Sequence, residues 1–333
     1  MSGDSIGRQV AMRRIGILAG DDLGQAQAVA AGLAERWQVM ILSRSRAGWF
    51  LGNHALGETP AASAGAAVTL AATADVLLPV GVDPAAYALA NLVARPCPAV
   101  PGPIGADWWS TRLAAVDAGL RVADGICVRR GAARALDFMG PVTVRPATRA
   151  PRSARTDVAE PGELQTALHH ALVYADRVVV EEASPGPAVT MALVCRADGG
   201  VLVSSPIGEP ARELATAMTG EMPLRAGALS TSGGRTGTRP PLPPPGSDRY
   251  RSVATDRATR SLLDQAALAT RDAVRGGGAM TVDFVLDPTG GMPILTAVDI
   301  APNLGAQAAW AHAFAASGVA YPDLLDILVG GAA

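Results

Sequence analysis

The sequence predicts a protein of the α/β and α+β classes with two or three domains. The chain has 333 residues, 49% of them hydrophobic, which is enough to bury a large core in more than one domain. Strand and helix patterns alternate over residues 14–80, whereas residues 280–304 carry the pattern of a β-hairpin. The alternation predicts a parallel sheet flanked by helices, and the hairpin predicts an antiparallel sheet near the other end of the chain.

The alternating region begins with the apolar run Arg14–Gly20, which predicts a strand. A helix pattern covers residues 25–37, and further strands are expected at 37–43 and 75–80. Ligands of a parallel sheet lie beyond the carboxyl ends of its strands. The segment Gly20–Gly24 stands at such an end, but it lacks the glycine pattern of dinucleotide-binding proteins. Its two aspartates would also repel a phosphate at the start of the helix.

A proline-rich connector at 96–105 marks the first expected domain boundary. Asp107 is a suitable N-cap for a helix that runs to Ala118, and Gly119 is a suitable end for it. The elements that follow predict an α+β middle domain. Strands are expected at 126–130, 141–146, 177–182 and 188–196, and a helix at 163–174.

The last part of the chain, from Ser205, carries the hairpin. Residues 281–286 alternate between apolar and polar, 287–291 are turn formers, and 294–300 are apolar again. The hairpin places Asp283 and Asp299 on neighbouring strands. Two such carboxylates can hold Mg²⁺, which prefers oxygen ligands, or they can be solvated residues of the hairpin. Helices are expected at 256–275 and 321–328.

Composition excludes several classes of function. The net charge of −2 gives no reason to expect nucleic acid or a membrane as partner, so a small molecule or a protein is expected. Cys97, Cys127 and Cys195 are too scattered for a disulfide framework, which favours a cytoplasmic protein. Residues 1–14 lack the apolar core of a signal peptide, and the apolar stretch 61–74 is too short to span a bilayer. The absence of lysine beside abundant Ala, Gly and Pro indicates a GC-rich bacterial gene.

Familiar catalytic motifs are also missing from the sequence. The four histidines, His54, His169, His170 and His312, show no metal-ligand spacing. Neither a G-x-S-x-G sequence nor a P-loop occurs.

Several short motifs, in their order along the chain, resemble those of the D-alanine:D-alanine ligases, which belong to the ATP-grasp superfamily. They are V-R-P at 144–146, V-V-V-E-E at 178–182, G-P-A-V-T at 186–190, S-P-I-G-E at 205–209, V-D-F-V-L-D at 282–287 and A-F-A-A-S-G-V-A-Y-P-D-L-L-D-I-L-V at 313–329. The resemblance implies a three-domain ATP-grasp fold. Its parts are an N-terminal parallel α/β domain (1–104), a central lid (105–204) and a C-terminal antiparallel-sheet domain (205–333).

The resemblance also implies an activity. These ligases transfer a phosphate from ATP to a carboxylate, and an amine then attacks the acyl phosphate. ATP, Mg²⁺, an amino acid or similar small acid as substrate, possible use in secondary metabolism, and a homodimer are therefore expected. Residues 230–246, rich in Gly, Ser and Pro, are predicted to be a mobile loop: either one that closes over the site or a plain linker.

Matching positions give a set of expected site residues. Asp283 takes the place of a metal-binding aspartate, and Asp299 with Asn303 would complete the metal ligands. Glu181 corresponds to an acidic residue near the adenine. Arg145 replaces a lysine that grips the nucleotide.

The phosphate-binding loop corresponds to residues 150–155. Pro151 has no backbone amide to offer to a phosphate. Arg149, Arg152 and Arg155 either grip an anion with their side chains instead or form a solvated basic loop.

Other family positions have changed. The catalytic arginine is Thr281, and no catalytic residue can be assigned. Further changes are a metal-binding glutamate to Ala297, the second lysine to Trp108, the ribose-binding glutamate to Ala188, a substrate-side glutamate to Gln25 and a serine to Ala308.

Two interpretations therefore remain open: a divergent ligase, and an inactive pseudo-ligase that serves as a binding or scaffolding protein. A third, chemistry without ATP, has no identifiable nucleophile or base. Trp108, Trp109 and Trp310 are either core residues or fill the vacated nucleotide cleft.

Overall fold

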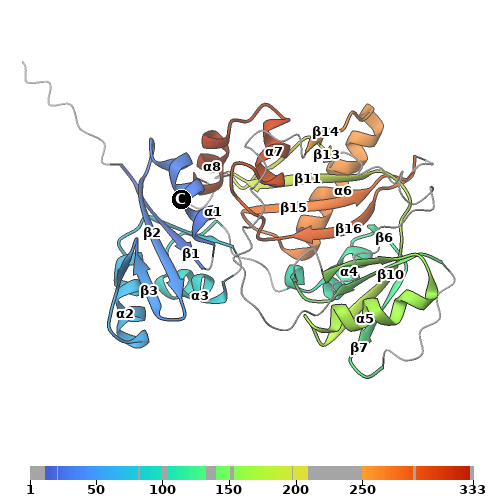
Figure 1. The fold of residues 1–333 in the computed structure, drawn as a ribbon. Coiled ribbons are helices and arrows are strands. Elements are labelled where there is room, and N and C mark those ends of the chain that lie inside the picture. Colours follow the sequence, from blue (N-terminus) through green and yellow to red (C-terminus); the bar gives the residue numbers. More distant parts are fainter. Residues whose placement is uncertain are drawn as a thin grey trace, which may run out of the picture.

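The structure is a computed structural model in which three sheets form the scaffold (Figure 1). It describes residues 12–20, 22–81, 83–98, 104–132, 140–150, 154–196, 198–208, 250–287 and 290–330. The predicted mobile loop at 230–246 lies outside these residues. Among the helices that the structure describes, none combines the length and the apolar character that crossing a bilayer requires.

The N-terminal sheet has the strand order β4-β3-β2-β1-β5. Strands β1, β2 and β5 are parallel, as the alternating sequence pattern predicted. Strands β3 and β4 extend it as an antiparallel ribbon that the sequence did not predict. The bounds are β1 Arg14–Ala19, α1 Leu23–Leu33, β2 Gln38–Ser45, β3 Gly48–Leu51, β4 His54–Ala55, α2 Pro60–Ala71, β5 Val76–Val80 and α3 Pro84–Val93.

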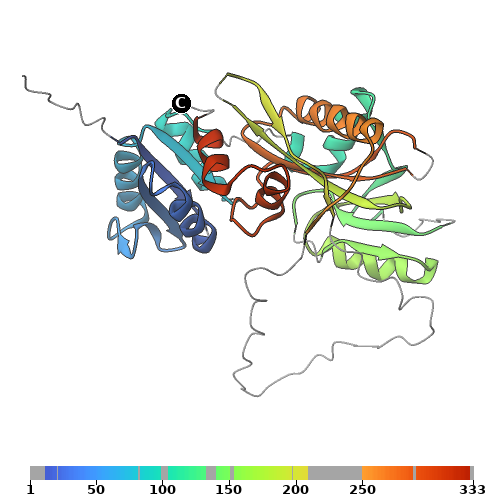
Figure 2. The ribbon, with the colours of Figure 1, turned by 90° about the horizontal axis from the view of Figure 1, so that it is seen from above.

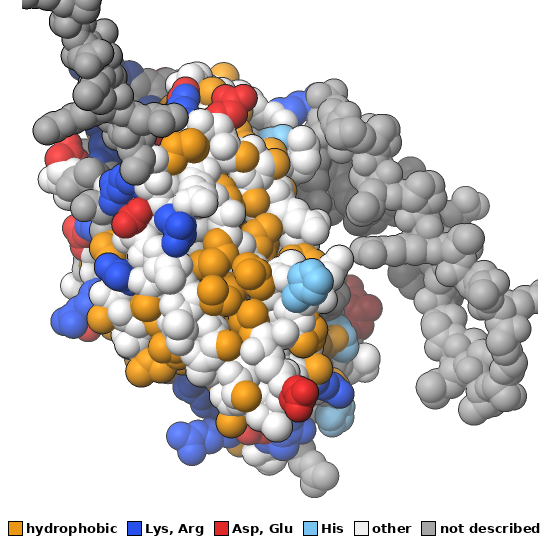
Figure 3. Space-filling model, turned by 90° about the vertical axis from the view of Figure 1, so that its left-hand side faces the viewer, with side chains coloured by type: hydrophobic (Ala, Val, Ile, Leu, Met, Phe, Trp, Pro, Cys, Tyr) orange, Lys and Arg blue, Asp and Glu red, His pale blue; other side chains and the backbone are white. Residues whose placement is uncertain are grey.

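The three N-terminal helices contain no charged residue. Each begins at a side-chain cap, from Asp22, Thr59 and Asp83 respectively, which satisfies a backbone amide of the first turn. The apolar stretch at 61–74 thus forms most of α2. On this side of the molecule hydrophobic side chains lie in the middle of the face and charged ones around them (Figure 3).

The central sheet is antiparallel with the order β7-β10-β8-β9. Helix α5 packs on one of its faces, where Leu168 and Leu172 lie against Val144, Val178 and Val180. Neighbouring residues of a strand point to opposite sides, so the opposite face carries Thr143, Arg145 and Glu181 together with the buried Val179. The bounds are β7 Gly125–Arg129, β8 Val142–Pro146, β9 Thr156–Val158, the 3₁₀ turn η4 Pro161–Glu163, α5 Leu164–Leu172 and β10 Arg177–Glu182.

The large sheet has the order β14-β13-β11-β15-β16-β6, with β12 beside β11. The predicted hairpin is confirmed as β15 and β16, paired antiparallel with Asp283 opposite Ala297 and Thr281 opposite Asp299. The bounds are η1 Ile104–Ala106, α4 Trp108–Asp117, β6 Arg121–Val122, β11 Ala188–Cys195, β12 Val201–Val203, β13 Ile207–Gly208, β14 Arg251–Ser252, α6 Arg257–Val274, β15 Ala279–Val285, β16 Ile294–Asp299, α7 Ala309–Ala315 and α8 Tyr321–Gly330.

One strand lies in a different sheet from the one expected. The sequence placed residues 188–196 in the middle domain, but β11 pairs with β15 along its length. Gly186, with φ of 134°, packs closely on the backbone of Leu286 and turns the chain onto the large sheet. The strand is buried on both faces, as a central strand of a large sheet must be. The domain limits 105–204 and 205–333 remain a prediction.

The two ends of the described chain share one hydrophobic core. Ile15, Val29 and Leu33 from the N-terminal sheet and α1 lie in the same buried cluster as Trp310 and Leu325 from the last two helices. Figure 2 shows α7 and α8 between the N-terminal sheet and the large sheet. The last helices therefore join the N-terminal sheet to the rest of the molecule.

Two buried tyrosine side chains make the free energy of unfolding depend on pH in the alkaline range. Tyr87 donates to the carbonyl of Gly81 and Tyr321 to that of Leu304, each at 2.9 Å. Burial raises the pKa of each phenol from 10 to about 12. Because the pKa of each tyrosine is higher in the folded state, both side chains stabilise the folded protein. Their contribution is complete below pH 10 and is lost as the pH rises through about 12.

We therefore expect the free energy of unfolding to fall between pH 10 and about 12. Absorbance titration of phenolate measures the ionisation, and Tyr321→Phe should make the fall in stability shallower. Ionisation of both tyrosines near pH 10 in the folded protein would contradict the expectation.

Candidate functional site

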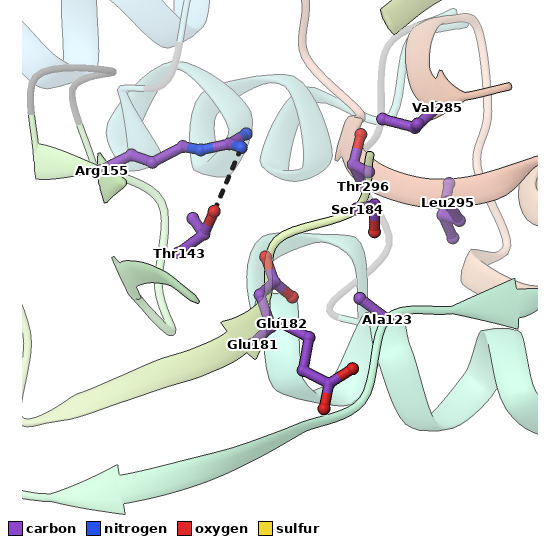
Figure 4. Close-up of a pocket in the computed structure, with 9 residues that line it drawn as sticks. All are labelled: Ala123, Thr143, Arg155, Glu181, Glu182, Ser184, Val285, Leu295 and Thr296. Carbon is purple, nitrogen blue, oxygen red and sulfur yellow. Dashed lines mark hydrogen bonds between the residues drawn. The ribbon is translucent and has the colours of Figure 1, made fainter. Parts of the chain in front are cut away.

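A cleft between the central sheet and the large sheet brings together most of the site residues expected from the sequence. The face of the central sheet away from α5 carries Thr143, Arg145 and Glu181. The facing side of the large sheet carries Asp283 and Thr296. A cavity of about 40 Å³ lies here, lined by Thr143, Glu181 and Thr296 and, among others, by Glu182 and Arg155 (Figure 4).

Glu181 is the centre of a buried polar network at this cleft. Its side chain is only 7% exposed and accepts hydrogen bonds from three groups. The Trp108 indole donates from 3.0 Å, the Arg112 guanidinium from 2.9 Å and the Arg145 guanidinium from 3.4 Å. Both guanidinium groups lie on one carboxylate, and burial of charge is tolerated because it is paired and hydrogen-bonded.

Arg145 connects Glu181 with the large sheet. Its guanidinium lies 4.1 Å from the centre of the Trp108 ring and donates at 2.6 Å to the carbonyl oxygen of Thr296. Burial lowers its pKa to about 10, although the neighbouring Glu181 acts in the opposite direction. The side chain therefore stays cationic at neutral pH, in a stacked geometry that suits arginine better than lysine.

Arg112 belongs to the site although the sequence analysis did not single it out. It follows Trp108 by four residues on α4, so both side chains leave the same face of the helix. Besides Glu181, it donates at 2.5 Å to the carbonyl of Ala123. This i, i+4 spacing was the one signal in the sequence for its participation.

Asp299, an expected metal ligand, is engaged by arginine. The Arg149 guanidinium donates to its two carboxylate oxygens at 2.6 and 3.2 Å, a bidentate ion pair. Arg149 also donates at 3.0 Å to the carbonyl of Ala301, while the Ala301 amide donates at 3.0 Å to Asp299. The Arg149 guanidinium therefore pairs with the carboxylate that was expected to bind Mg²⁺.

Asp283 and Asn303, the other expected metal ligands, have different surroundings. Asp283 lies on the same face of the hairpin as Asp299 and accepts from the Thr190 hydroxyl at 2.6 Å. Asn303 is exposed, and its side-chain oxygen accepts from the Gly305 amide at 2.8 Å. No group of three or more His, Cys, Asp or Glu residues in the described part of the chain is arranged to hold a metal ion.

The expected anion-binding loop is described only in part. Arg155 lies near Thr143 and Asp157, at 3.5 Å from an oxygen of each, and lines the small cavity (Figure 4). Arg152 lies outside the described residues. Binding of an anion by Arg152 and Arg155 remains a prediction.

The positions expected beside a substrate have structural roles. Gln25 is buried, and its amide can donate to Asp22 at 3.1 Å and accept from the Leu304 amide at 2.7 Å. Ala308 is the N-cap of α7 and offers no side-chain hydrogen bond to it. Thr281 lies between Ala192 and Asp299 in the sheet. Gln25 thus connects α1 with the segment before α7, and none of these three positions carries a charged side chain.

Solved structures of ligases share the whole arrangement of sheets. The VanG D-Ala:D-Ser ligase from Enterococcus faecalis matches with a TM-score of 0.68 at 16% identity, over 96% of this chain and 99% of that one. D-alanyl-alanine synthetase A from Vibrio cholerae matches with a TM-score of 0.70 at 14% identity, over 96% and 98%. The chain has the ATP-grasp fold of the D-alanine:D-alanine ligases.

Two further comparisons bear on this ligase fold. The D-alanine:D-alanine ligase from Bacillus anthracis, solved in complex with ATP, matches with a TM-score of 0.66 at 14% identity, over 95% of each chain. In sequence, the D-alanine:D-alanine ligase of Corynebacterium urealyticum is 28% identical over 195 residues. That match covers 58% of this chain and 48% of the relative, so it spans about half of the relative's length. No protein-family model matches the chain.

ATP and Mg²⁺, which the ligase fold implies, do not fit the residues in this arrangement. Pockets for ligands of this size usually enclose about 300–1,000 Å³, whereas the cavity measures about 40 Å³. Trp108 and Arg145 occupy the cleft beside Glu181, and Arg149 forms an ion pair with Asp299.

Proposed function

We propose that this ligase-fold protein does not catalyse ATP-dependent ligation and acts as a binding or scaffolding protein. The observation that supports this most strongly is the network of Trp108, Arg112 and Arg145 on Glu181. These side chains bond to one carboxylate and fill the cleft, although the buried Nε of Arg112 has no hydrogen-bond partner. The changes at Thr281 and Ala297, which remove a cation and a carboxylate of the family pattern, point the same way.

Admitting an adenine would require the network to open. Breaking a buried ion pair costs about 3–5 kcal/mol when one charge is left unpaired. At about 1.4 kcal/mol for each tenfold change, this would weaken ATP binding by a factor on the order of 10²–10³. The nucleotide would have to supply contacts of that strength, while two cations of the family pattern have been replaced, at Trp108 and Thr281. Its metal-binding and ribose-binding glutamates have also been replaced, by Ala297 and Ala188, and Asp299 is paired with Arg149.

An active ligase is the second candidate, favoured by three residues at matching positions. Arg145 and Glu181 face the cleft, and Asp283 lies on the hairpin face where the metal-binding aspartate is expected. Such an enzyme would join an amino acid or similar small acid to an amine, using ATP and Mg²⁺. A homodimer, a cytoplasmic location and a role in secondary metabolism remain predictions.

Calorimetric titration of ATP with Mg²⁺ separates the two functions. For the wild-type protein we expect no saturable heat at millimolar nucleotide, because the cleft is filled. Asp283→Ala tests the expected metal ligand. Asp176→Ala is the matched control, because the Asp176 side chain is 91% exposed and forms an ion pair with Arg130. Saturable binding that Asp283→Ala weakens and Asp176→Ala leaves unchanged would establish the ligase-type site and overturn the proposal.

A further inference from the structure

Two arginines of the central sheet region reach across the cleft to a single strand of the large sheet. Arg145, on β8, donates at 2.6 Å to the carbonyl of Thr296 on β16. Arg149, just after β8, forms the bidentate pair with Asp299 at the end of β16 and also binds the carbonyl of Ala301. These contacts join segments about 150 residues apart, as their separations of 151, 150 and 152 residues show.

The contacts fall where β16 has no neighbouring strand on that side. Strand β6 pairs with Ile294 and Leu295 only, so within the described residues the edge of β16 from Thr296 onward faces the central sheet. Carbonyl groups at such an edge need donors. The guanidinium groups supply them at Thr296 and Ala301. They act beside an apolar contact, because Val179 of the central sheet lies in the same buried cluster as Leu295 and Ile300.

Arg145 is held in place on its own side of the cleft, whereas the contacts of Arg149 lie across it. Arg145 is stacked on Trp108 and paired with Glu181, so that its reach to Thr296 is part of a buried arrangement. Arg149 is more exposed, at 41%, and its hold on Asp299 depends on the two parallel hydrogen bonds. Its pair is the contact that a single substitution can remove without opening the buried network.

We propose that the chain closes its own cleft: Arg149 on Asp299, with Arg145 on Thr296, holds the central sheet against the large sheet without nucleotide or metal. The inference rests on the proposed function and deepens it, because it assigns a constant shape to the binding or scaffolding protein. A cation attached to the chain neutralises Asp299, whatever the concentration of ATP or Mg²⁺. The closed surface is then always available to a partner.

Pulsed electron paramagnetic resonance measures this closure directly. Spin labels at Val173→Cys, at the end of α5, and Leu268→Cys, on α6, report the separation of the central sheet from the large sheet. Both side chains are exposed, at 76% and 38%. The three native cysteines are replaced by alanine in every variant, and a thermal melt confirms folding. We expect one narrow distance distribution that ATP with Mg²⁺ does not shift.

Substitutions at the ion pair provide the decisive comparison. Arg149→Asp and Asp299→Arg should each lengthen and broaden the distribution, and the double variant Arg149→Asp/Asp299→Arg should restore most of the short distance. Arg130→Met is the matched control, because Arg130 pairs with Asp176 inside the central domain. Single variants that keep the wild-type distribution would overturn the proposal. If they fail to fold, the wild-type measurement with and without ATP still decides.

The outcomes also separate this inference from the proposed function. A wild-type distribution that is broad alone and shortens with ATP and Mg²⁺ would overturn both. A narrow, unchanging distribution together with saturable ATP binding would overturn the proposed function and leave the closure standing.

Discussion

Replacing Glu181 with glutamine should lower the free energy of unfolding by about 3–5 kcal/mol. Glutamine keeps the shape of the side chain but removes the one anion shared by Arg112 and Arg145. Two buried guanidinium groups would then lie close together without a carboxylate. Because domains are stable by only about 5–15 kcal/mol, a loss of this size is readily measured by urea denaturation.

Glu182→Gln is the matched control for this effect. Glu182 follows Glu181 on β10, but its side chain is exposed. We expect a change within about 0.5 kcal/mol, as for most surface substitutions. Equal effects of the two variants would show that the buried network does not hold the cleft closed.

Trp108→Ala should cost about 3–5 kcal/mol, the usual range for removing a buried aromatic side chain. The indole is 6% exposed, stacks under Arg145 and donates to Glu181. Its removal leaves a cavity at the position where the family pattern has a lysine near the nucleotide. We expect indole or adenine, added at millimolar concentration, to raise the melting temperature of the variant and not that of the wild type.

Trp109→Ala provides the comparison at the next residue. Trp109 is only partly buried and has the Arg112 guanidinium 5.6 Å from its ring. It should cost less stability, and neither indole nor adenine should restore it. A Trp108→Ala variant as stable as the wild type would mean that the indole does not fill the cleft.

Large parts of the fold follow from the sequence because their signals are local. The hairpin of β15 and β16 has alternating residues around a turn, and α4 begins at Asp107, whose side chain accepts from the Ser110 amide. Helices α2 and α3 are less visible. They were not predicted, because they are rich in alanine and few large apolar residues mark a buried face.

The contacts of the candidate site could not be predicted from the sequence. The family pattern predicted Arg145, Glu181 and Asp299 as site residues, and that assignment stays a prediction. The pairing of Arg149 with Asp299 depends on how two sheets meet, 150 residues apart in the sequence, and no local pattern encodes it. For the same reason Trp108 was left undecided between core and cleft, whereas the structure places it in both, buried and bonded to Glu181.

The core shared by the two ends of the chain has a consequence for biosynthesis. Strand β1 and helix α1 are synthesised before Trp310, Leu325 and Val329, which complete one of the cores of the N-terminal sheet. Domains generally fold during synthesis, but the face of this sheet that packs on α7 and α8 must wait for those helices. Until then its apolar surface is exposed to chaperones, and truncations that remove α8 should leave an N-terminal sheet that aggregates.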